Sequence, residues 1–154
     1  MLPDALVVAD ASPIIGLGRA GHLHLLPAVF ATVTAPPAVV AEVGQRPAWL
    51  RSVEVEHPAE AELLRALSFG RGESEVLAVA LRRPGAVALL DEKRARGFAS
   101  ARGVAVVGTV GVVLRARQRG VIAAVRPVLD DLIGSGFRLS ESLYRAALSR
   151  AGEA

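Results

Sequence analysis

The sequence of 154 residues has no cysteine and no long apolar run. The absence of cysteine excludes disulfides and thiolate metal sites, which is consistent with a reducing cytoplasm. The uncharged apolar stretch from Gly103 to Leu114 has 12 residues, whereas a membrane-spanning helix needs about 20. The first apolar segment follows Asp4 and no basic residue precedes it, so we expect no secretory signal peptide. These absences predict a soluble, cytoplasmic protein without a membrane partner.

Lysine is also scarce, since Lys93 is the one lysine among 18 basic residues. The net charge of +3 is uneven, because residues 1–80 carry −4 (nine acids, five bases) and residues 81–154 carry +7 (thirteen bases, six acids). A bias towards arginine explains the choice of base, but it does not explain why no acid occurs from Lys93 to Arg126. This segment predicts contact with a polyanion such as RNA. The residues predicted to bind RNA are Lys93, Arg94, Arg96, Arg115, Arg117 and Arg119.

Short apolar strands alternate with helices along the chain, which predicts a single α/β domain over residues 1–154 with a mostly parallel sheet. The expected strands are Leu6–Asp10, Val29–Val33, Val87–Leu90 and Val104–Val107. The first expected helix has Ser12 as its N-cap and Pro13 at its first position, and it ends near Ala20. The last covers Glu141–Arg150 and is capped by Ser140. Between them we expect helices over Ala38–Val43, Pro58–Leu67, Glu73–Arg82, Lys93–Arg102 and Val110–Gln118. A further short element over Leu23–Leu26 is expected to be broken by Pro27.

Two of the expected strands end in acids, at Asp10 and at Asp91. Ligands of open parallel sheets bind outside the carboxyl ends of the strands, and both carboxylates should lie at that edge. Either acid alone is more simply interpreted as a helix cap. For Asp10 this simpler interpretation is weaker, because Ser12 already suits the cap position.

Three further acids lie on helices. Glu73 shares the apolar helix face of Val76 and Leu77, where a carboxylate is costly unless it is compensated. Glu75 falls on the other side and is expected to be solvated. Glu42 ends a short apolar helix, where the helix dipole disfavours negative charge, and exposure is its simplest interpretation.

Taken together, Asp10, Glu42, Glu73 and Asp91 suggest a cluster. Unit like charges 4 Å apart repel by about 4 kcal/mol at an effective dielectric of 20. Protons or a cation must relieve that repulsion, and oxygen ligands suit Mg²⁺ or Mn²⁺. A bound metal ion lowers the pKa of its water, so acids beside an arginine-rich segment predict a metal-dependent phosphodiesterase.

At these residues the sequence resembles the PIN-domain ribonuclease superfamily, close to its VapC-type toxins. The matching segments are VVADASPI at Asp10, PPAVVAEV at Glu42, GRGESEVLAVAL at Glu73 and ALLDEKRAR at Asp91. Two later segments, VVGTVGVVLRARQRGVI and GFRLSESLYRAAL, resemble one prokaryotic subgroup. The resemblance covers nearly the whole chain.

The resemblance implies a three-layer α/β/α sandwich, one or two Mg²⁺ or Mn²⁺ ions and endoribonuclease activity that leaves a 5′-phosphate. It also implies the toxin half of a toxin–antitoxin pair, with a cognate antitoxin as partner. Carried over by position, Asp10, Glu42, Glu73 and Asp91 hold the metal, with Glu75 as second choice for the helix acid. Ser12 would support Asp10 by hydrogen bonding, and Thr109 would line the same edge. The apolar content of 52% suggests a homodimer and an antitoxin helix that cover apolar surface, although a rich core explains it comparably well.

Other interpretations stay open. PIN domains often have Asp where Glu73 stands, and Thr or Ser where Leu89 stands, so a PIN-like module that binds RNA or an antitoxin without cleavage is the main alternative. The segment from Gly16 to Gly21 matches the dinucleotide fingerprint G-x-G-x-x-G, but it follows the start of a helix instead of a strand. A phosphoacceptor receiver domain would need a lysine at a later strand end, and Lys93 is in the wrong place. His22, His24 and His57 lack metal-ligand spacing.

Overall fold

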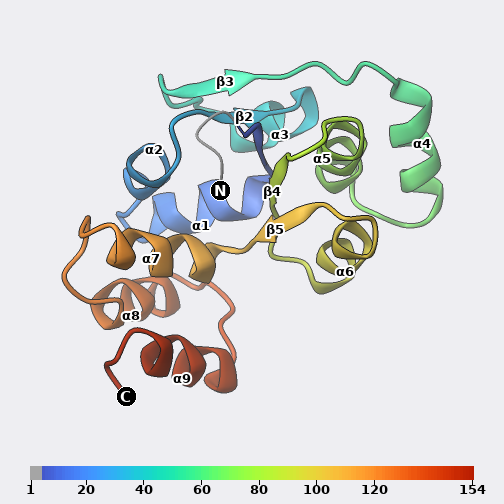
Figure 1. Ribbon diagram of the computed structural model, residues 1–154. Coiled ribbons are helices and arrows are strands. Elements are labelled where there is room, and N and C mark those ends of the chain that lie inside the picture. The colour runs from blue at the N-terminus through green and yellow to red at the C-terminus, as the bar shows by residue number, and fades with distance from the viewer. Residues whose placement is uncertain (1–4) are drawn as a thin grey trace.

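The computed structural model describes residues 5–154, so Asp4, on which the expectation about a signal peptide depends, lies outside the described residues. At its centre is a parallel sheet with the strand order β3-β2-β1-β4-β5, seen nearly edge-on in Figure 1. The strands are β1 (Val7–Ala9), β2 (Val33–Ala35), β3 (Leu50–Ser52), β4 (Val87–Leu89) and β5 (Ala105–Val107). The expected parallel sheet is confirmed.

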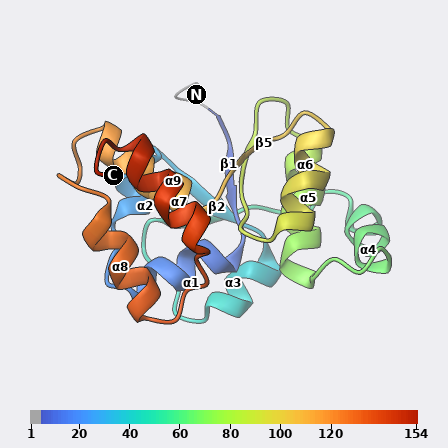
Figure 2. The same ribbon diagram turned by 90° about the horizontal axis from the view of Figure 1, so that it is seen from below.

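Helices cover both faces of the sheet, as parallel strands require. They are α1 (Ala11–Arg19), α2 (Leu25–Val29), α3 (Pro37–Val43), α4 (Pro58–Ala66), α5 (Arg71–Leu81), α6 (Lys93–Ala101), α7 (Thr109–Gln118), α8 (Arg126–Gly134) and α9 (Glu141–Arg150). One face carries α1, α2 and α7, with α8 packed on α1 and α7, and the other carries α4, α5 and α6 (Figure 2). The three-layer α/β/α architecture is confirmed. No helix within residues 5–154 is long and apolar enough to cross a membrane.

The two central strands place the ends of β1 and β4 level with each other. All residues of both strands are buried, because each strand has neighbours on both sides and helices above and below. Ala9 is paired with Leu89, and the amide of Asp10 donates to the carbonyl oxygen of Leu89 at 3.0 Å. The residues that follow these strands therefore emerge side by side at the carboxyl edge.

The start of the chain differs from the sequence prediction in three respects. The first helix begins at Ala11 and its N-cap is Asp10, whose side chain accepts from the Ala11 amide; the prediction that Ser12 is the cap is wrong. Pro27 lies inside α2 instead of breaking it, since proline is tolerated in the first turn of a helix. Strand β2 begins at Val33, and Val29 belongs to α2.

Other differences follow from position in the fold. Helix α5 begins at Arg71, two residues before the expected start at Glu73. The apolar sequence of strand β5 would suit a buried strand, but Ala105 is exposed, because β5 is an edge strand with one neighbour. Strand β3 and helix α8 were not predicted. Ser140 caps α9 as expected, and its hydroxyl accepts from the amide of Leu143 at 3.1 Å.

Candidate active site

A cavity of about 430 Å³ opens at the carboxyl edge of the sheet, beside the ends of β1 and β4. Four carboxylates line it, from Asp10, Glu73, Asp91 and Glu92. Glu92 already serves as the N-cap of α6, because its carboxylate oxygens accept from the amides of Arg94 at 3.0 Å and Ala95 at 2.6 Å. The other three belong to the set that the sequence predicts, and they come from separate elements. We call this cavity the acidic cavity.

Asp10 is the most deeply placed of these acids, with 9% of its surface exposed. Burial, the largest cause, raises the pKa of its carboxyl group from 3.8 to about 7; the hydrogen bond from the Ala11 amide opposes the rise, and the negative charges of Glu73, Glu42 and Asp91 add to it. Within residues 5–154, no ion pair includes any of these four acids. In the described part of the chain, the carboxylate of Asp10 therefore has no ion-pair partner.

Asp91 is held in one orientation by three hydrogen bonds. Its Oδ1 accepts from the amide of Thr109 at 2.7 Å, and its Oδ2 accepts from the Thr109 hydroxyl at 2.6 Å. Oδ2 also accepts from the hydroxyl of Ser12 at 3.1 Å. Ser12 thus supports the acid after β4; the prediction that its partner is Asp10 is wrong. Thr109 lies at the same edge, where the sequence placed it.

The two acids of helix α5 lie in different places. Oε1 of Glu73 accepts from the amide of Gly70 at 3.0 Å, which closes the first turn of the helix, and the side chain lines the acidic cavity. Glu75 is half-buried, and its Oε1 accepts from the amide of Ala38 at 2.9 Å. The expectation that Glu75 is solvated is wrong, because its side chain caps α3. It lines a separate cavity with Pro37 and other residues.

Glu42 is exposed at the last turn of α3, and Gly72 brings it close to Asp10. A Cβ added to Gly72 would stand 2.9 Å from Oδ1 of Asp10 and 3.6 Å from Oε1 of Glu42. The missing side chain lets the start of α5 approach both carboxylates. The sequence analysis missed Gly72, since only the neighbours in space show why a glycine stands there.

Replacing Gly72 by alanine should therefore damage the site although alanine favours a helix. A contact of 2.9 Å forces the Asp10 carboxylate to move, and a misplacement of about 1 Å can cost 100-fold in rate. Gly97 in α6 is the matched control, since a Cβ there meets nothing within 4 Å. We expect Gly97→Ala to raise the free energy of unfolding by about 0.5–1 kcal/mol and to leave any nuclease rate unchanged. Equal rates for both variants would contradict this role of Gly72.

The acids suit a hydrated divalent cation better than a fully enclosed one. Within the described residues, no three Asp, Glu or His side chains lie close enough together to enclose a metal ion. Mg²⁺ keeps several waters and binds proteins through one or two carboxylates. The uncompensated charge of Asp10 and the fixed carboxylate of Asp91 therefore fit such an ion. That all four acids hold the metal stays a prediction.

A second cavity of about 780 Å³ adjoins the acidic cavity. Both cavities are lined by Asp91, Phe137 and Arg138. We call the second cavity the arginine groove, because its lining includes Arg96, Arg115, Arg119, Arg138 and Arg150. The first three of these were predicted from the sequence to bind RNA. Arg138 and Arg150 were missed, because they lie outside the acid-free segment and reach the groove only after the chain folds back.

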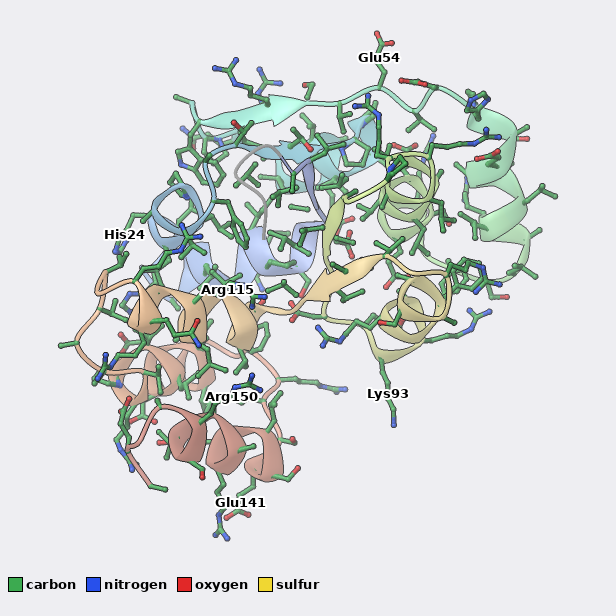
Figure 3. The ribbon with its side chains drawn as sticks, in the orientation of Figure 1. His24, Glu54, Lys93, Arg115, Glu141 and Arg150 are labelled. Carbon is green, nitrogen blue, oxygen red and sulfur yellow. The ribbon has the colours of Figure 1, made fainter. Side chains whose placement is uncertain are left out.

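The other residues predicted to bind RNA do not line this groove. Lys93 is exposed and projects away from the rest of the molecule below α6 (Figure 3). The Arg94 guanidinium lies 4.1 Å from the centre of the Phe69 ring and donates to the carbonyl oxygen of Leu67. Arg117 lies on α7 but is not among the lining residues. Their contact with RNA stays a prediction.

The glycine-rich segment has a packing role at this site. Gly16 and Gly18 lie inside α1 instead of in a loop after a strand, so the fold does not support the dinucleotide interpretation. A Cβ at Gly16 would stand 2.9 Å from Cδ1 of Phe137, so the glycine makes room for that ring between the two cavities. His22 is engaged elsewhere, with its Nε2 2.7 Å from Oδ2 of Asp131.

An all-parallel sheet with helices on both faces and an acid-lined cavity at its carboxyl edge defines an α/β protein with a candidate site at that edge. A family model described as a PIN domain matches residues 6–153. The chain therefore belongs to the PIN-domain family, and its resemblance to that superfamily is confirmed. No curated protein and no solved structure shows significant similarity to it.

Proposed function

We propose that the chain is a metal-dependent endoribonuclease whose active site is the acidic cavity. The observation that carries this proposal is the environment of Asp10. Its carboxyl group is buried, has a pKa of about 7, lies near three further acids and, among residues 5–154, takes part in no ion pair. Such an arrangement is unfavourable for folding and is typical of a functional site. Membership of the PIN-domain family, whose members are generally nucleases, supports the same activity.

The chain's own residues suit the binding and orientation of a phosphodiester. Asp10 and Asp91 would hold Mg²⁺ or Mn²⁺, with Glu73 and Glu42 beside them. The ion, when bound, lowers the pKa of a water molecule and stabilises the leaving oxygen. Thr109 and Ser12 fix the orientation of Asp91. Arg19 and Arg138 also line the cavity, where they can contact the phosphate. We expect in-line attack of water and a 5′-phosphate product.

A cleavage assay on a structured RNA with Mn²⁺ tests this proposal. We expect cleavage that a chelator abolishes and that Asp10→Asn lowers by about 100-fold or more, since even partners of metal ligands cost 10–100-fold. Glu54→Gln is the matched control, because Glu54 is exposed and points outward in Figure 3, and it should cleave normally. Metal-independent RNA binding without cleavage, unchanged by Asp10→Asn, would contradict the proposal and identify a binding module.

The toxin role belongs to the same proposal. Leu63 and Leu67 on and beside α4 are 67% and 52% exposed, and apolar surface of this kind suits an antitoxin helix or a second copy of the chain. A small neighbouring gene that encodes a DNA-binding or helical protein would support the toxin role. Its product should suppress both cleavage and growth arrest by the nuclease. Growth that is unaffected by expression of the active nuclease alone would contradict it.

A further inference from the structure

The guanidinium of Arg96 has a partner inside the protein. Arg96 lies near the start of α6, and its Nη1 donates to the carbonyl oxygen of Leu90 at 2.9 Å. Leu90 directly follows β4 and none of its surface is exposed, so its carbonyl oxygen needs a hydrogen-bond donor from the protein. Helix α6 packs against β5, the neighbour of β4 in the sheet (Figure 1). The sequence predicts contact with RNA for Arg96, whereas this bond indicates another role.

The bond from Arg96 replaces one that the sheet would otherwise make. Between β4 and β5, the amide of Leu90 donates to the carbonyl oxygen of Val107 at 3.0 Å. In a parallel ladder, the carbonyl oxygen of the same residue then accepts from the amide two positions further along the neighbouring strand, which is the amide of Thr109. That amide instead donates to Oδ1 of Asp91 at 2.7 Å. The ladder therefore ends one bond early, and the Leu90 carbonyl oxygen is left for Arg96.

Two acceptors compete for the amide of Thr109. One is the Leu90 carbonyl oxygen, which continues the ladder, and the other is the carboxylate of Asp91. A buried acceptor without a partner is costly, so the Leu90 carbonyl oxygen would draw the Thr109 amide back if Arg96 did not supply a donor. Asp91 would then lose one of the three hydrogen bonds that fix its orientation.

Gly108 provides the space in which the guanidinium lies. A Cβ at this position would stand 2.6 Å from Nη1 of Arg96 and 3.0 Å from Oδ1 of Asp91. Its φ of −93° and ψ of 177° are open to any residue, so space and not backbone conformation accounts for the glycine. Within residues 5–154 no ion pair joins Arg96 to Asp91. Arg96 therefore acts on Asp91 through the backbone.

We infer that Arg96 is a positioning residue, which holds the carbonyl oxygen of Leu90 and so frees the amide of Thr109 to orient the carboxylate of Asp91. Its consequence for catalysis rests on the proposed function, in which Asp91 holds the metal ion. In this role Arg96 touches neither the ion nor the RNA. Its loss should therefore lower metal affinity and turnover and leave the affinity for RNA unchanged.

The amide signal of Thr109 tests this exchange of hydrogen bonds without metal or RNA. An amide proton that donates to a carboxylate over a short distance resonates at lower field than one that donates to a carbonyl oxygen. In nitrogen–proton correlation spectra with a chelator present, Arg96→Met, which keeps the apolar stem and removes the donors, should move this signal upfield. The shift should approach that in Asp91→Asn, where no carboxylate accepts. Arg96→Lys, which keeps a charged donor, should leave the signal nearer to its wild-type position.

Arg102→Met is the matched control. Arg102 is the C-cap of the same helix, and its Nη1 also donates to a backbone carbonyl oxygen, that of Phe98 at 3.1 Å. The residue is exposed, and its acceptor belongs to α6 itself and not to the sheet edge. This variant removes the same charge and should leave the Thr109 signal in place. An unmoved signal in Arg96→Met, or an equal shift in both variants, would overturn the inference.

Metal binding and cleavage kinetics measure the consequence. Arg96→Met should bind Mn²⁺ about tenfold more weakly than the wild type and cleave with a kcat lowered about tenfold, the low end of the effect of partners of metal ligands. Its KM and its affinity for RNA in the presence of a chelator should stay within about twofold of those of Arg102→Met. A loss of RNA affinity with an unchanged kcat would overturn the positioning role and indicate contact with RNA.

The positioning role and the proposed function can fail separately. If the Thr109 signal moves in Arg96→Met but the wild-type protein cleaves nothing with Mn²⁺, the proposed function fails and the positioning role stands. If the wild-type protein cleaves RNA, and Arg96→Met cleaves at the same rate with its Thr109 signal unmoved, the positioning role fails and the proposed function stands.

Discussion

In the presence of a chelator at pH 8, Asp10→Asn should unfold at a higher temperature than the wild-type protein, by about 10 °C. The pKa of Asp10 is about 7 in the folded protein and 3.8 in its ordinary environment. The folded state therefore binds the Asp10 proton more tightly than the unfolded state does. This proton's contribution to the free energy of unfolding is fully present below pH 4 and is lost as the pH rises through 7. At 1.36 kcal/mol for each pH unit, this shift of the pKa corresponds to a loss of about 4 kcal/mol, which agrees with that change in melting temperature.

The pH dependence separates this effect from a general stabilisation. At pH 4 the wild-type carboxyl group is protonated and close in shape to asparagine, so the two proteins should melt within about 2 °C of each other. Glu54→Gln removes a charge from an exposed side chain and should follow the wild-type curve at every pH. An Asp10→Asn variant that is less stable than the wild type at pH 8 would show that the carboxylate has a counter-charge in solution.

The sequence predicts the centre of the site well because two strong signals coincide there. Wholly apolar strands occur in parallel sheets that are covered on both faces, and an acid directly after such a strand has to emerge at the carboxyl edge. This argument placed Asp10 and Asp91 together. The helical periodicity added Glu73 as a third acid. Glu73 shares a helix face with Val76 and Leu77, and this depends only on the spacing of the three residues in the sequence.

Long-range contacts explain most of what the sequence analysis missed. Asp10 and Ser12 are both good N-cap residues, so local sequence could not choose between them. The choice depends on Asp91, which lies 79 residues from Ser12 and accepts a hydrogen bond from its hydroxyl. Glu75 was misjudged for the same reason, because the amide that it caps belongs to Ala38 on another helix.

The arginine groove shows the same limit on a larger scale. The run of basic residues without an acid drew attention to residues 93–126, although Arg94 stacks on Phe69 and Lys93 projects outward. Arg138 and Arg150 join the groove because α8 packs on α1 and α7. Helix α8 was not predicted from the sequence, and it begins without a side-chain cap that could have indicated its start. A run of basic residues therefore shows that a segment is positively charged, but only the fold shows which of these charges lie together on the surface.

Mn²⁺ should bind the wild-type protein more tightly as the pH rises, because the ion and the proton compete for Asp10. Below a pKa of about 7 the affinity should fall about tenfold for each pH unit, which amounts to about 100-fold between pH 8 and pH 5. Titration calorimetry at pH 6 in two buffers with different ionisation enthalpies should show close to one proton released for each ion bound. This measurement requires no RNA and no cleavage.

Asp10→Asn is the decisive comparison for this coupling, since it removes the proton and keeps the shape of the side chain. Any binding that remains, through Asp91 and Glu73, should be weaker and should release much less than one proton at pH 6. Gly97→Ala, which adds a Cβ at an exposed position where it meets nothing within 4 Å, should match the wild type in affinity and proton release. Tight binding without proton release in the wild type would mean that the ion does not displace the Asp10 proton. The environment of Asp10 would then stop being an argument for a metal site, because its raised pKa would be a consequence of burial alone.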